Sequence, residues 1–278
     1  EIGVRLVGSE MCIRDRDVTE PINWDGDVHY IFHTAGLASP QDFTNHPVDT
    51  LWGHVQGTRN VLELARTHNG EKVLYVSTVE IYGEWKSEDG IKETDMGVMR
   101  CDNARACYPE AKRLCETMLA AYEMQYGIQY VGVRLCHTFG PGIVLNDGRA
   151  FSEFIRNVLE GKDIVLQTDG SAERTYTYVA DAIGAMLLAF TKGKENYYNI
   201  ANLDNLISIR DLAKLIVNLD PKGKSKVVFA DGVEQKLKYL PFKLGIMDVT
   251  RINQLGWNPQ VDLEHAFRYT MESFQQRS

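Results

Sequence analysis

The stretch 72-KVLYVSTVEIYG-83 opens with an apolar run and ends in hydroxyl and carboxyl side chains. Residues 72–77 have the composition of a strand buried on both faces, as strands of parallel sheets are. Ser77, Thr78 and Glu80 follow at its carboxyl end, and open α/β sheets bind their ligands at that edge. The stretch therefore predicts a parallel sheet and also the edge of it that carries the chemistry.

Strands and helices alternate on both sides of this stretch. Residues 28–33 and 130–135 are two further apolar runs of strand length. Residues 48–66 and 108–126 place apolar side chains at helical spacing between the strands. Strand, helix, strand, helix, strand is the order of a doubly wound α/β sheet, which is the fold class we predict.

The pattern becomes mixed after 140-GPG-142, so we predict a domain change there. The two domains are expected to span residues 17–140 and 141–278, with some of the chain crossing back. The elements expected in the second part are helices over 151–159, 181–191 and 263–274, a helix with Ser208 as its N-cap, and strands over 164–167 and 197–200.

Composition narrows the classes of function. The 278 residues are 44% apolar and 24% charged, which is ordinary for a globular protein with a sizeable core. The net charge of −8 argues against a nucleic-acid-binding face. No apolar run reaches the roughly 18 residues of a membrane helix, and no secretory signal is visible. Five cysteines without a CxxC pair favour a reducing, cytoplasmic location and no metal site.

Tyr108 and Lys112 form the second chemical feature, in 108-YPEAK-112. Side chains four residues apart share one face of a helix. A lysine ammonium there favours the tyrosine phenolate and lowers a pKa that is otherwise near 10. Such a tyrosine could remove a hydroxyl proton as a general base. A YxxxK pair alone is common, and Thr78 and Glu80 taken singly fit a capping hydroxyl and a solvated charge. The order and spacing of all four favour the catalytic interpretation.

Together these segments resemble the extended short-chain dehydrogenase/reductase family that acts on nucleotide sugars, which comprises epimerases, dehydratases and decarboxylases. The resemblance runs from about Asp17 to the C-terminus. Besides the two segments above, it rests on 17-DVT-19, 33-HTAGLASP-40, 54-HVQGTRNVLELA-65, 134-RLCHTFGPG-142, 146-NDGR-149, 173-ERTYTYVAD-181 and 255-LGWNP-259. It implies a Rossmann-type domain over 17–140 that binds NAD, with NADP not excluded, and a nucleotide-sugar domain over 141–278.

The resemblance also implies roles for single residues. Tyr108 would be the base, Lys112 would bind the nicotinamide ribose, and Thr78 would hold the sugar oxygen that is oxidised, with Glu80 as a further catalytic group. The residues expected at the cofactor are Asp17, Val18, Ala35, Gly36, Ser39, His54, Ser77, Tyr108 and Lys112. Those expected at the UDP- or dTDP-sugar are Thr78, His137, Asn146, Arg149 and Arg174. His54 and His137 stand where the family usually has Asn, so His137 could instead be a packed loop residue, and Arg174 could be a surface arginine.

The reaction type is decided after the sugar has been oxidised to a 4-keto form. Val79 stands where the family's dehydratases have an Asp, so dehydration lacks its acid. The decarboxylases usually have Ser there and an arginine within the stretch that is 243-KLGIM-247 here. We therefore rank 4-epimerisation first, UDP-glucuronate decarboxylation second and 4,6-dehydration third. A reductase using NADPH as a dissociable reagent and a fragment without cofactor binding remain as alternatives.

The N-terminal segment 1-EIGVRLVGSEMCIRDR-16 lacks the glycine-rich turn that grips the cofactor pyrophosphate. It resembles a translated sequencing adapter, so we expect a non-native segment in place of about 50 to 60 residues. A divergent natural N-terminus is the alternative. Truncation predicts weak or absent NAD binding and an exposed sheet edge near residues 28–33. The resemblance further implies a homodimer formed through the helices over 48–66 and 108–126.

Overall fold

Four parallel strands form the main sheet of the computed structural model, which describes residues 14–85, 89–220, 222–230 and 245–275. In spatial order they are β1 (Tyr30–His33), β2 (Lys72–Thr78), β3 (Gln129–Leu135) and β7 (Tyr197–Ile200). All four strands were predicted from their apolar runs, and the predicted α/β fold class is confirmed.

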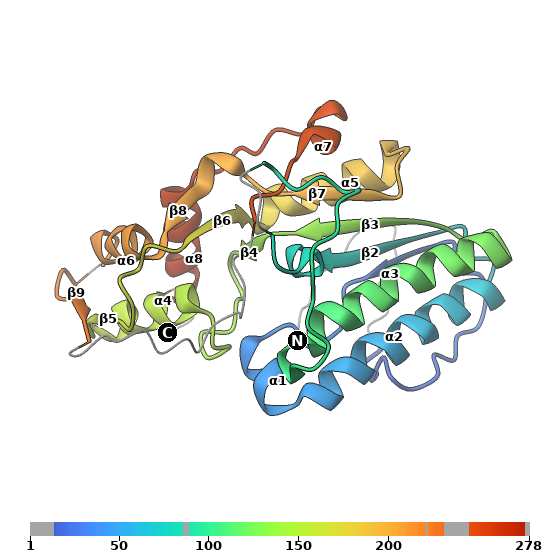
Figure 1. Ribbon diagram of the computed structural model, residues 1–278, viewed down its shortest axis with the longest axis horizontal. Coiled ribbons are helices and arrows are strands. Elements are labelled where there is room, and N and C mark those ends of the chain that lie inside the picture. The colour runs from blue at the N-terminus through green and yellow to red at the C-terminus, as the bar shows by residue number, and fades with distance from the viewer. Residues whose placement is uncertain (1–13, 86–88, 221, 231–244, 276–278) are drawn as a thin grey trace.

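Helices cover both faces of this sheet (Figure 1). The helices α2 (Pro47–Thr67) and α3 (Cys107–Tyr126) lie side by side on one face, and α5 (Val179–Lys192) lies on the other. Successive strand residues point to opposite faces, so Tyr75 packs under α2 and α3 while Leu74 packs under α5. This burial on both faces explains why the strands are continuous apolar runs.

The strand β1 lies at the edge of the sheet. Among the residues that the structure describes, it pairs with β2 alone. Its outward side chains are large and apolar, and Tyr30 and Phe32 are 57% and 46% exposed. The predicted exposed edge near residues 28–33 is confirmed, whereas most of the predicted non-native segment, residues 1–13, lies outside the described residues.

A second core, smaller and rich in aromatic residues, occupies the other half of the molecule. Phe139, Phe151, Tyr176 and Phe267 are buried against one another in its centre. Its helices are α4 (Ala150–Glu160), α6 (Ile209–Asn218) and α8 (Leu263–Gln275), and its strands are β4 (His137–Phe139), β5 (Ile164–Leu166), β6 (Glu173–Tyr178), β8 (Leu206–Ser208) and β9 (Val227–Phe229). The predicted N-cap is confirmed, since the Ser208 hydroxyl accepts a hydrogen bond from the Asp211 amide at 3.0 Å.

Sequence reasoning missed four strands of this half, β4, β6, β8 and β9. The first three form a separate mixed sheet, in which β6 pairs in parallel with β4 and antiparallel with β8. The strand β6 reads ERTYTY, with polar residues at most positions, and β4 and β8 have only three residues each. Runs this short or this polar show no clear period, so their sequences do not distinguish them from loops.

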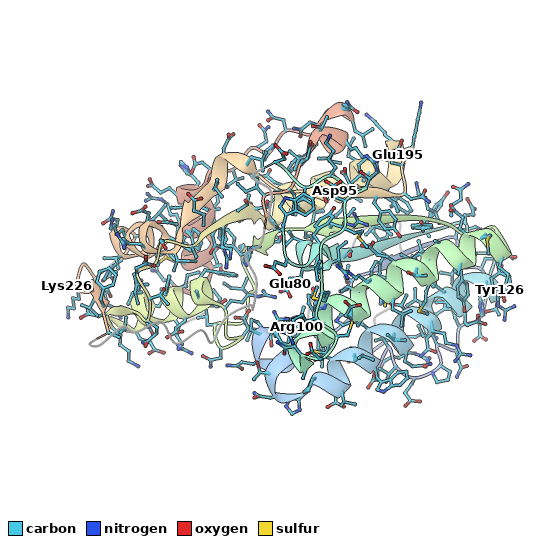
Figure 2. The ribbon with its side chains drawn as sticks, in the orientation of Figure 1. Glu80, Asp95, Arg100, Tyr126, Glu195 and Lys226 are labelled. Carbon is cyan, nitrogen blue, oxygen red and sulfur yellow. The ribbon has the colours of Figure 1, made fainter. Side chains whose placement is uncertain are left out.

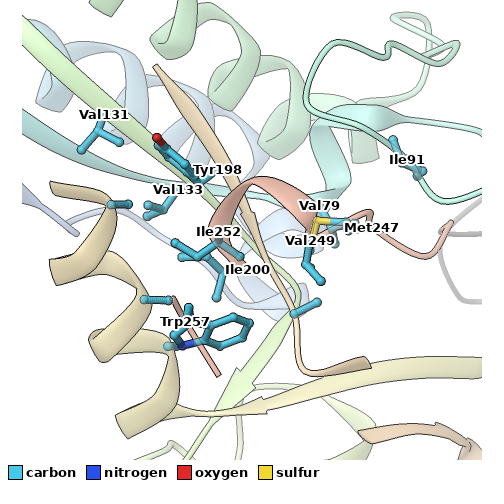
Figure 3. Close-up of a cluster of buried hydrophobic side chains, with 14 of the residues drawn as sticks. Val79, Ile91, Val131, Val133, Tyr198, Ile200, Met247, Val249, Ile252 and Trp257 are labelled. Carbon is cyan, nitrogen blue, oxygen red and sulfur yellow. The ribbon is translucent and has the colours of Figure 1, made fainter. Parts of the chain in front are cut away.

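The chain crosses back into the first core after residue 178. The helices α5 and α7 (Thr250–Gln254) pack on the parallel sheet, and β7 is its fourth strand. Figure 3 shows Ile252 and Trp257 of this late segment beside Val131, Val133 and Ile200. A single cut near residue 140 therefore does not separate the two cores, and the predicted domain boundaries stay a prediction.

Candidate active site

The strand β2 ends in a turn that sends neighbouring side chains in opposite directions. Thr78 caps the 3₁₀ turn η1 (Val79–Tyr82), because its hydroxyl accepts a hydrogen bond from the Glu80 amide at 3.3 Å. Val79 points into the core, where Figure 3 shows it beside Met247 and Val249. Glu80 points the other way, toward the gap between the two cores (Figure 2). The turn thus directs Val79 into the hydrophobic core and Glu80 away from it, where its carboxylate binds Arg105.

Tyr108 lies in the first turn of α3 and is held by aromatic rings on two sides. The turn η2 (Ala104–Ala106) leads directly into this helix. Phe43, from the short helix α1 (Pro40–Asn45), stacks on the phenol with ring centroids 4.3 Å apart. His54 of α2 meets it edge-on at 5.3 Å. The phenol on α3 is therefore held by side chains of two neighbouring helices, α1 and α2, that are far from α3 in the sequence.

The surroundings of Tyr108 set its acidity. Burial raises its pKa well above the usual range, and the nearby Glu80 carboxylate raises it further. A hydrogen bond from Thr78 and the positive charges of Arg149 and Arg105 lower it. The structure thus brings Thr78 and Tyr108 together among charges of both signs, and burial leaves the pKa of Tyr108 raised, where the sequence argument expected it to be lowered.

Lys112 lies one turn after Tyr108, on the same helix face. Its Nζ donates a hydrogen bond to the Val76 carbonyl at 2.7 Å and lies 5.9 Å from the centre of the Tyr108 ring. Burial lowers the pKa of Lys112 to about 8. An ammonium carries three N–H donors, so two remain beside this bond for hydroxyl groups of a ligand.

Arg105 and Phe43 are site residues that sequence reasoning missed. Nη2 of Arg105 lies 3.0 and 3.1 Å from the two carboxylate oxygens of Glu80. The same guanidinium lies over the Phe43 ring, 4.6 Å from its centre. Arg105 could have been identified from the sequence, because it lies three residues before Tyr108, near the start of the same helix. Phe43 could not have been, because the six residues of α1 are too few to show a helical period.

His54 anchors the loop that follows β1. The backbone of Gly36 has a φ of +143°, and a Cβ there would lie only 2.2 Å from Cε1 of His54. Nε2 of His54 lies 2.8 Å from the Leu37 carbonyl. Burial and the charge of Lys112 lower the pKa of His54 to about 4, so the ring is neutral and Nε2 donates this bond. The histidine thus supports the exposed loop containing Ala35 and Gly36.

Several predicted contact residues are engaged within the chain. The Ser77 hydroxyl donates to Glu116 at 2.6 Å, so it has no proton left to donate to a cofactor. The Asn146 side chain accepts a hydrogen bond from Arg156. The other such contacts are Ser39 with Asp42, Asp17 with Thr19, Val18 with Asn60, and Arg149 with Ala38 and Asp147.

Arg174 and His137 lie on the side of the site that the second core provides. Burial lowers the pKa of Arg174, whose positive charge in turn acts on Glu80. Burial, Arg174 and Arg149 lower the pKa of His137 to about 3, so its ring is neutral. One carboxylate and three arginines therefore face this region, and a net positive charge suits an anionic ligand.

The surface also has a groove of about 640 Å³ between α6 and α8. None of the candidate active-site residues lines this groove. Among the residues that the structure describes, no three or more His, Cys, Asp or Glu side chains are grouped so that they could hold a metal ion. No helix in the described part of the chain is long and apolar enough to cross a membrane.

The family model described as "NAD dependent epimerase/dehydratase family" matches residues 5–201. The chain belongs to this family. UDP-glucuronic acid decarboxylase 1 of Xenopus tropicalis is 31% identical over 94% of the chain and 59% of its own length. UDP-glucuronic acid decarboxylase 5 of Arabidopsis thaliana is 30% identical over 94% of the chain and 74% of its own length. The chain thus spans about 59% of the length of the Xenopus relative.

Solved structures agree with this assignment. UDP-glucose 4-epimerase of Thermotoga maritima, solved with UDP-glucose, superposes with a TM-score of 0.75 and 26% identity, over 90% of this chain and 78% of that one. UDP-N-acetylglucosamine 4-epimerase of Methanobrevibacter ruminantium M1 gives a TM-score of 0.80 at 23% identity, over 95% and 82%, and shows the shared fold. The solved structures therefore support the same fold and the same NAD-dependent epimerase/dehydratase family.

The described residues fit the nicotinamide half of this cofactor. Lys112 keeps two N–H donors beside its bond to Val76. The loop at Ala35 and Gly36 is exposed at the carboxyl end of β1, next to the strand from which Thr78 projects. At Gly36 the missing side chain lets the loop backbone lie directly against the His54 ring, which fixes the position of the loop. We therefore expect these residues to hold the nicotinamide and its ribose.

Proposed function

We propose that the chain catalyses NAD-dependent 4-epimerisation of a nucleotide sugar through a 4-keto intermediate. One observation carries the proposal. The Thr78 hydroxyl is close enough to the Tyr108 phenol to lower its pKa, and the Lys112 ammonium lies 5.9 Å from the centre of the same ring, one helix turn further on. A base, a hydroxyl that holds the sugar oxygen and a fixed positive charge are the groups that 4-epimerisation needs from the protein.

The side chains have complementary tasks in this reaction. Tyr108 removes the proton of the sugar 4-hydroxyl, while Thr78 hydrogen-bonds the same oxygen. Lys112 stabilises the phenolate by its charge, which offsets part of the burial that opposes ionisation. NAD, when bound, accepts the hydride from C4 and later returns it. After the keto sugar has turned over, Tyr108 gives the proton back, so neither protons nor electrons are consumed overall.

The position of Val79 supports epimerisation over dehydration. Elimination of water requires a proton donor next to the catalytic hydroxyl, and the side chain at this position is buried, 6% exposed, among apolar residues. Glu80 is the one carboxyl that η1 directs toward Tyr108, and Arg105 engages it. A 4-epimerase needs no second acid, so the site as built is sufficient for it.

Decarboxylation of a nucleotide-linked uronic acid is the second candidate. Oxidation at C4 of such a sugar gives a β-keto acid, which releases CO₂ and takes up a proton at C5. The arginines near Glu80 favour an anionic sugar, and the UDP-glucuronic acid decarboxylases are relatives of this chain. Against it stand the absence of Ser beside Thr78 and of an arginine within residues 243–247, of which 243 and 244 lie outside the described part.

Product analysis separates the candidates. The chain is incubated with NAD and a panel of UDP- and dTDP-sugars, including UDP-glucose and UDP-glucuronate, and the products are read by NMR. A C4 epimer without gas release supports the first proposal. Release of CO₂ from UDP-glucuronate would instead support decarboxylation. A 4-keto-6-deoxy product would support neither epimerisation nor decarboxylation. If no nucleotide sugar changes, both proposals are wrong for this chain.

We also propose substrate contacts and a homodimer. In this proposal Arg174 and Arg149 bind the nucleotide diphosphate, for which guanidinium groups are well suited. The outer faces of α2 and α3 expose Trp52 and Leu114, at 58% and 47%, which a second copy of the chain could cover. Helices with such exposed apolar residues are a suitable dimer interface.

A further inference from the structure

Arg105 stands in a layered arrangement with the proposed base. Its guanidinium lies over one face of Phe43 at 4.6 Å, and Phe43 is stacked on Tyr108 at 4.3 Å with an angle of 18° between the rings. The same guanidinium binds both oxygens of Glu80. Arg105 therefore contacts the ring that supports Tyr108 and also the carboxylate that acts on it.

The ion pair is well shielded from solvent. The side chains of Arg105 and Glu80 are 21% and 14% exposed, so water screens their charges much less than at the surface. A carboxylate left without its partner in such a place strongly disfavours a second negative charge nearby. The second negative charge in this site would be the Tyr108 phenolate.

We propose that Arg105 is a positioning residue for Tyr108, which neutralises the Glu80 carboxylate beside the phenol and supports the Phe43 ring stacked on it. The inference rests on the proposed function only in taking Tyr108 as the base. The other charged or titratable groups around the phenol are His54 on α2, Tyr75 on β2, Cys107 and Lys112 on α3, and Arg149 before α4.

The electrostatic part predicts a definite order among variants. Arg105→Gln removes the ion-pair partner of Glu80 and leaves only the charges of Arg149 and Arg174 acting on it, so forming the phenolate becomes harder. Glu80→Gln leaves Arg105 unopposed, so forming it becomes easier. The double variant removes both charges and lies near the unmodified chain. In the pH profile of kcat/KM the rising limb should therefore move up by about one pH unit in R105Q, roughly a tenfold loss at neutral pH. It should move down in E80Q and return in the double variant.

A second measurement needs no turnover. Tyrosines labelled with ¹³C at Cζ give one resonance for each of the 13 in the chain, and Tyr108 is assigned by its loss in Tyr108→Phe. The Tyr108 resonance should shift as Glu80 ionises, and E80Q should abolish that step. In R105Q the step should move to higher pH, because the carboxylate has lost its counter-charge. Arg105→Lys keeps a charge and should restore most of the effect.

Arg100→Gln is the matched control, since Arg100 pairs with Asp102 while 78% exposed. It should leave both measurements unchanged. An unmoved resonance step in R105Q would overturn the proposal, and so would pH limbs that do not follow the predicted order. If the R105Q variant does not fold, R105K and E80Q still test the proposal, because E80Q by itself must move the rising limb of the kcat/KM profile to lower pH. Absence of turnover with a normal resonance step would sink the proposed function and leave the Arg105–Glu80 coupling established.

Discussion

The Lys112 ammonium donates a 2.7 Å hydrogen bond to the Val76 carbonyl, two residues before the Thr78 hydroxyl on the same strand. The bond ties the helix of the proposed base to the strand of the proposed hydroxyl. It holds a positive charge in a place that is only 5% exposed. The proposed function therefore requires at this position a positive charge whose burial opposes folding.

Lys112→Met should stabilise the chain while abolishing activity. Folding lowers the pKa of Lys112 from 10.5 to about 8, so the charged lysine opposes folding at pH 7. Burying this charge costs up to about 3 kcal/mol of folding free energy, which the variant recovers. The variant also loses the hydrogen bond to the Val76 carbonyl, which contributes about 1 kcal/mol. The melting temperature of the variant should exceed that of the unmodified chain at pH 7, with the gap closing between pH 8 and 10.5. The exposed Lys192→Met serves as control, and a lower melting temperature at pH 7 would contradict this explanation.

Tyr108→Phe should lower kcat by about 10²–10⁴-fold, because it removes the group that takes the proton. The ring and its stacking on Phe43 are retained, so the free energy of unfolding should change little. Tyr122→Phe, on the same helix and bonded to Glu63, tests whether losing any phenol from α3 has this effect. Comparable rates for the two variants would exclude Tyr108 as the base.

Val79→Asp should destabilise the fold by more than about 3 kcal/mol, since it places an unpaired carboxyl in the core. It should not create dehydratase activity, because the side chain points away from Tyr108. Val144→Asp, at a position that is 64% exposed, should leave the denaturation midpoint nearly unchanged. A stable V79D variant that forms a 4-keto-6-deoxy sugar would show that our placement of this residue is wrong.

Leu114→Glu should convert a dimer into a monomer. The residue is exposed on α3, where the proposed interface would bury it, and a carboxylate in an apolar interface is costly. Light scattering after size-exclusion chromatography gives the mass directly. Val165→Glu, an exposed strand position in the second core, should leave the mass unchanged. A monomeric unmodified chain would remove the homodimer proposal.

The parallel strands and their covering helices were predictable because burial on both faces forces continuous apolar runs and helical spacing. The pairing of Tyr108 with Lys112 was equally local, since a helix places residues four apart on one face. The end of the strand near Thr78 was predicted as well, because polar residues follow the apolar run there, whereas the opposite directions of Val79 and Glu80 were not predicted. The sequence by itself therefore determined the α/β sheet, its chemical edge and the proposed base.

Only the tertiary structure decided which partners these residues have. Phe43 and Arg105 come from segments of little local pattern, and they meet Tyr108 because α1 and η2 converge on the start of α3. The hydroxyl of Ser77 is engaged by Glu116, and the Val79 side chain faces the core. The short strands β4, β6 and β8 likewise depend on pairing across the second core. Contacts between segments far apart in the chain leave no period in the sequence, and the charges around the base are contacts of this kind.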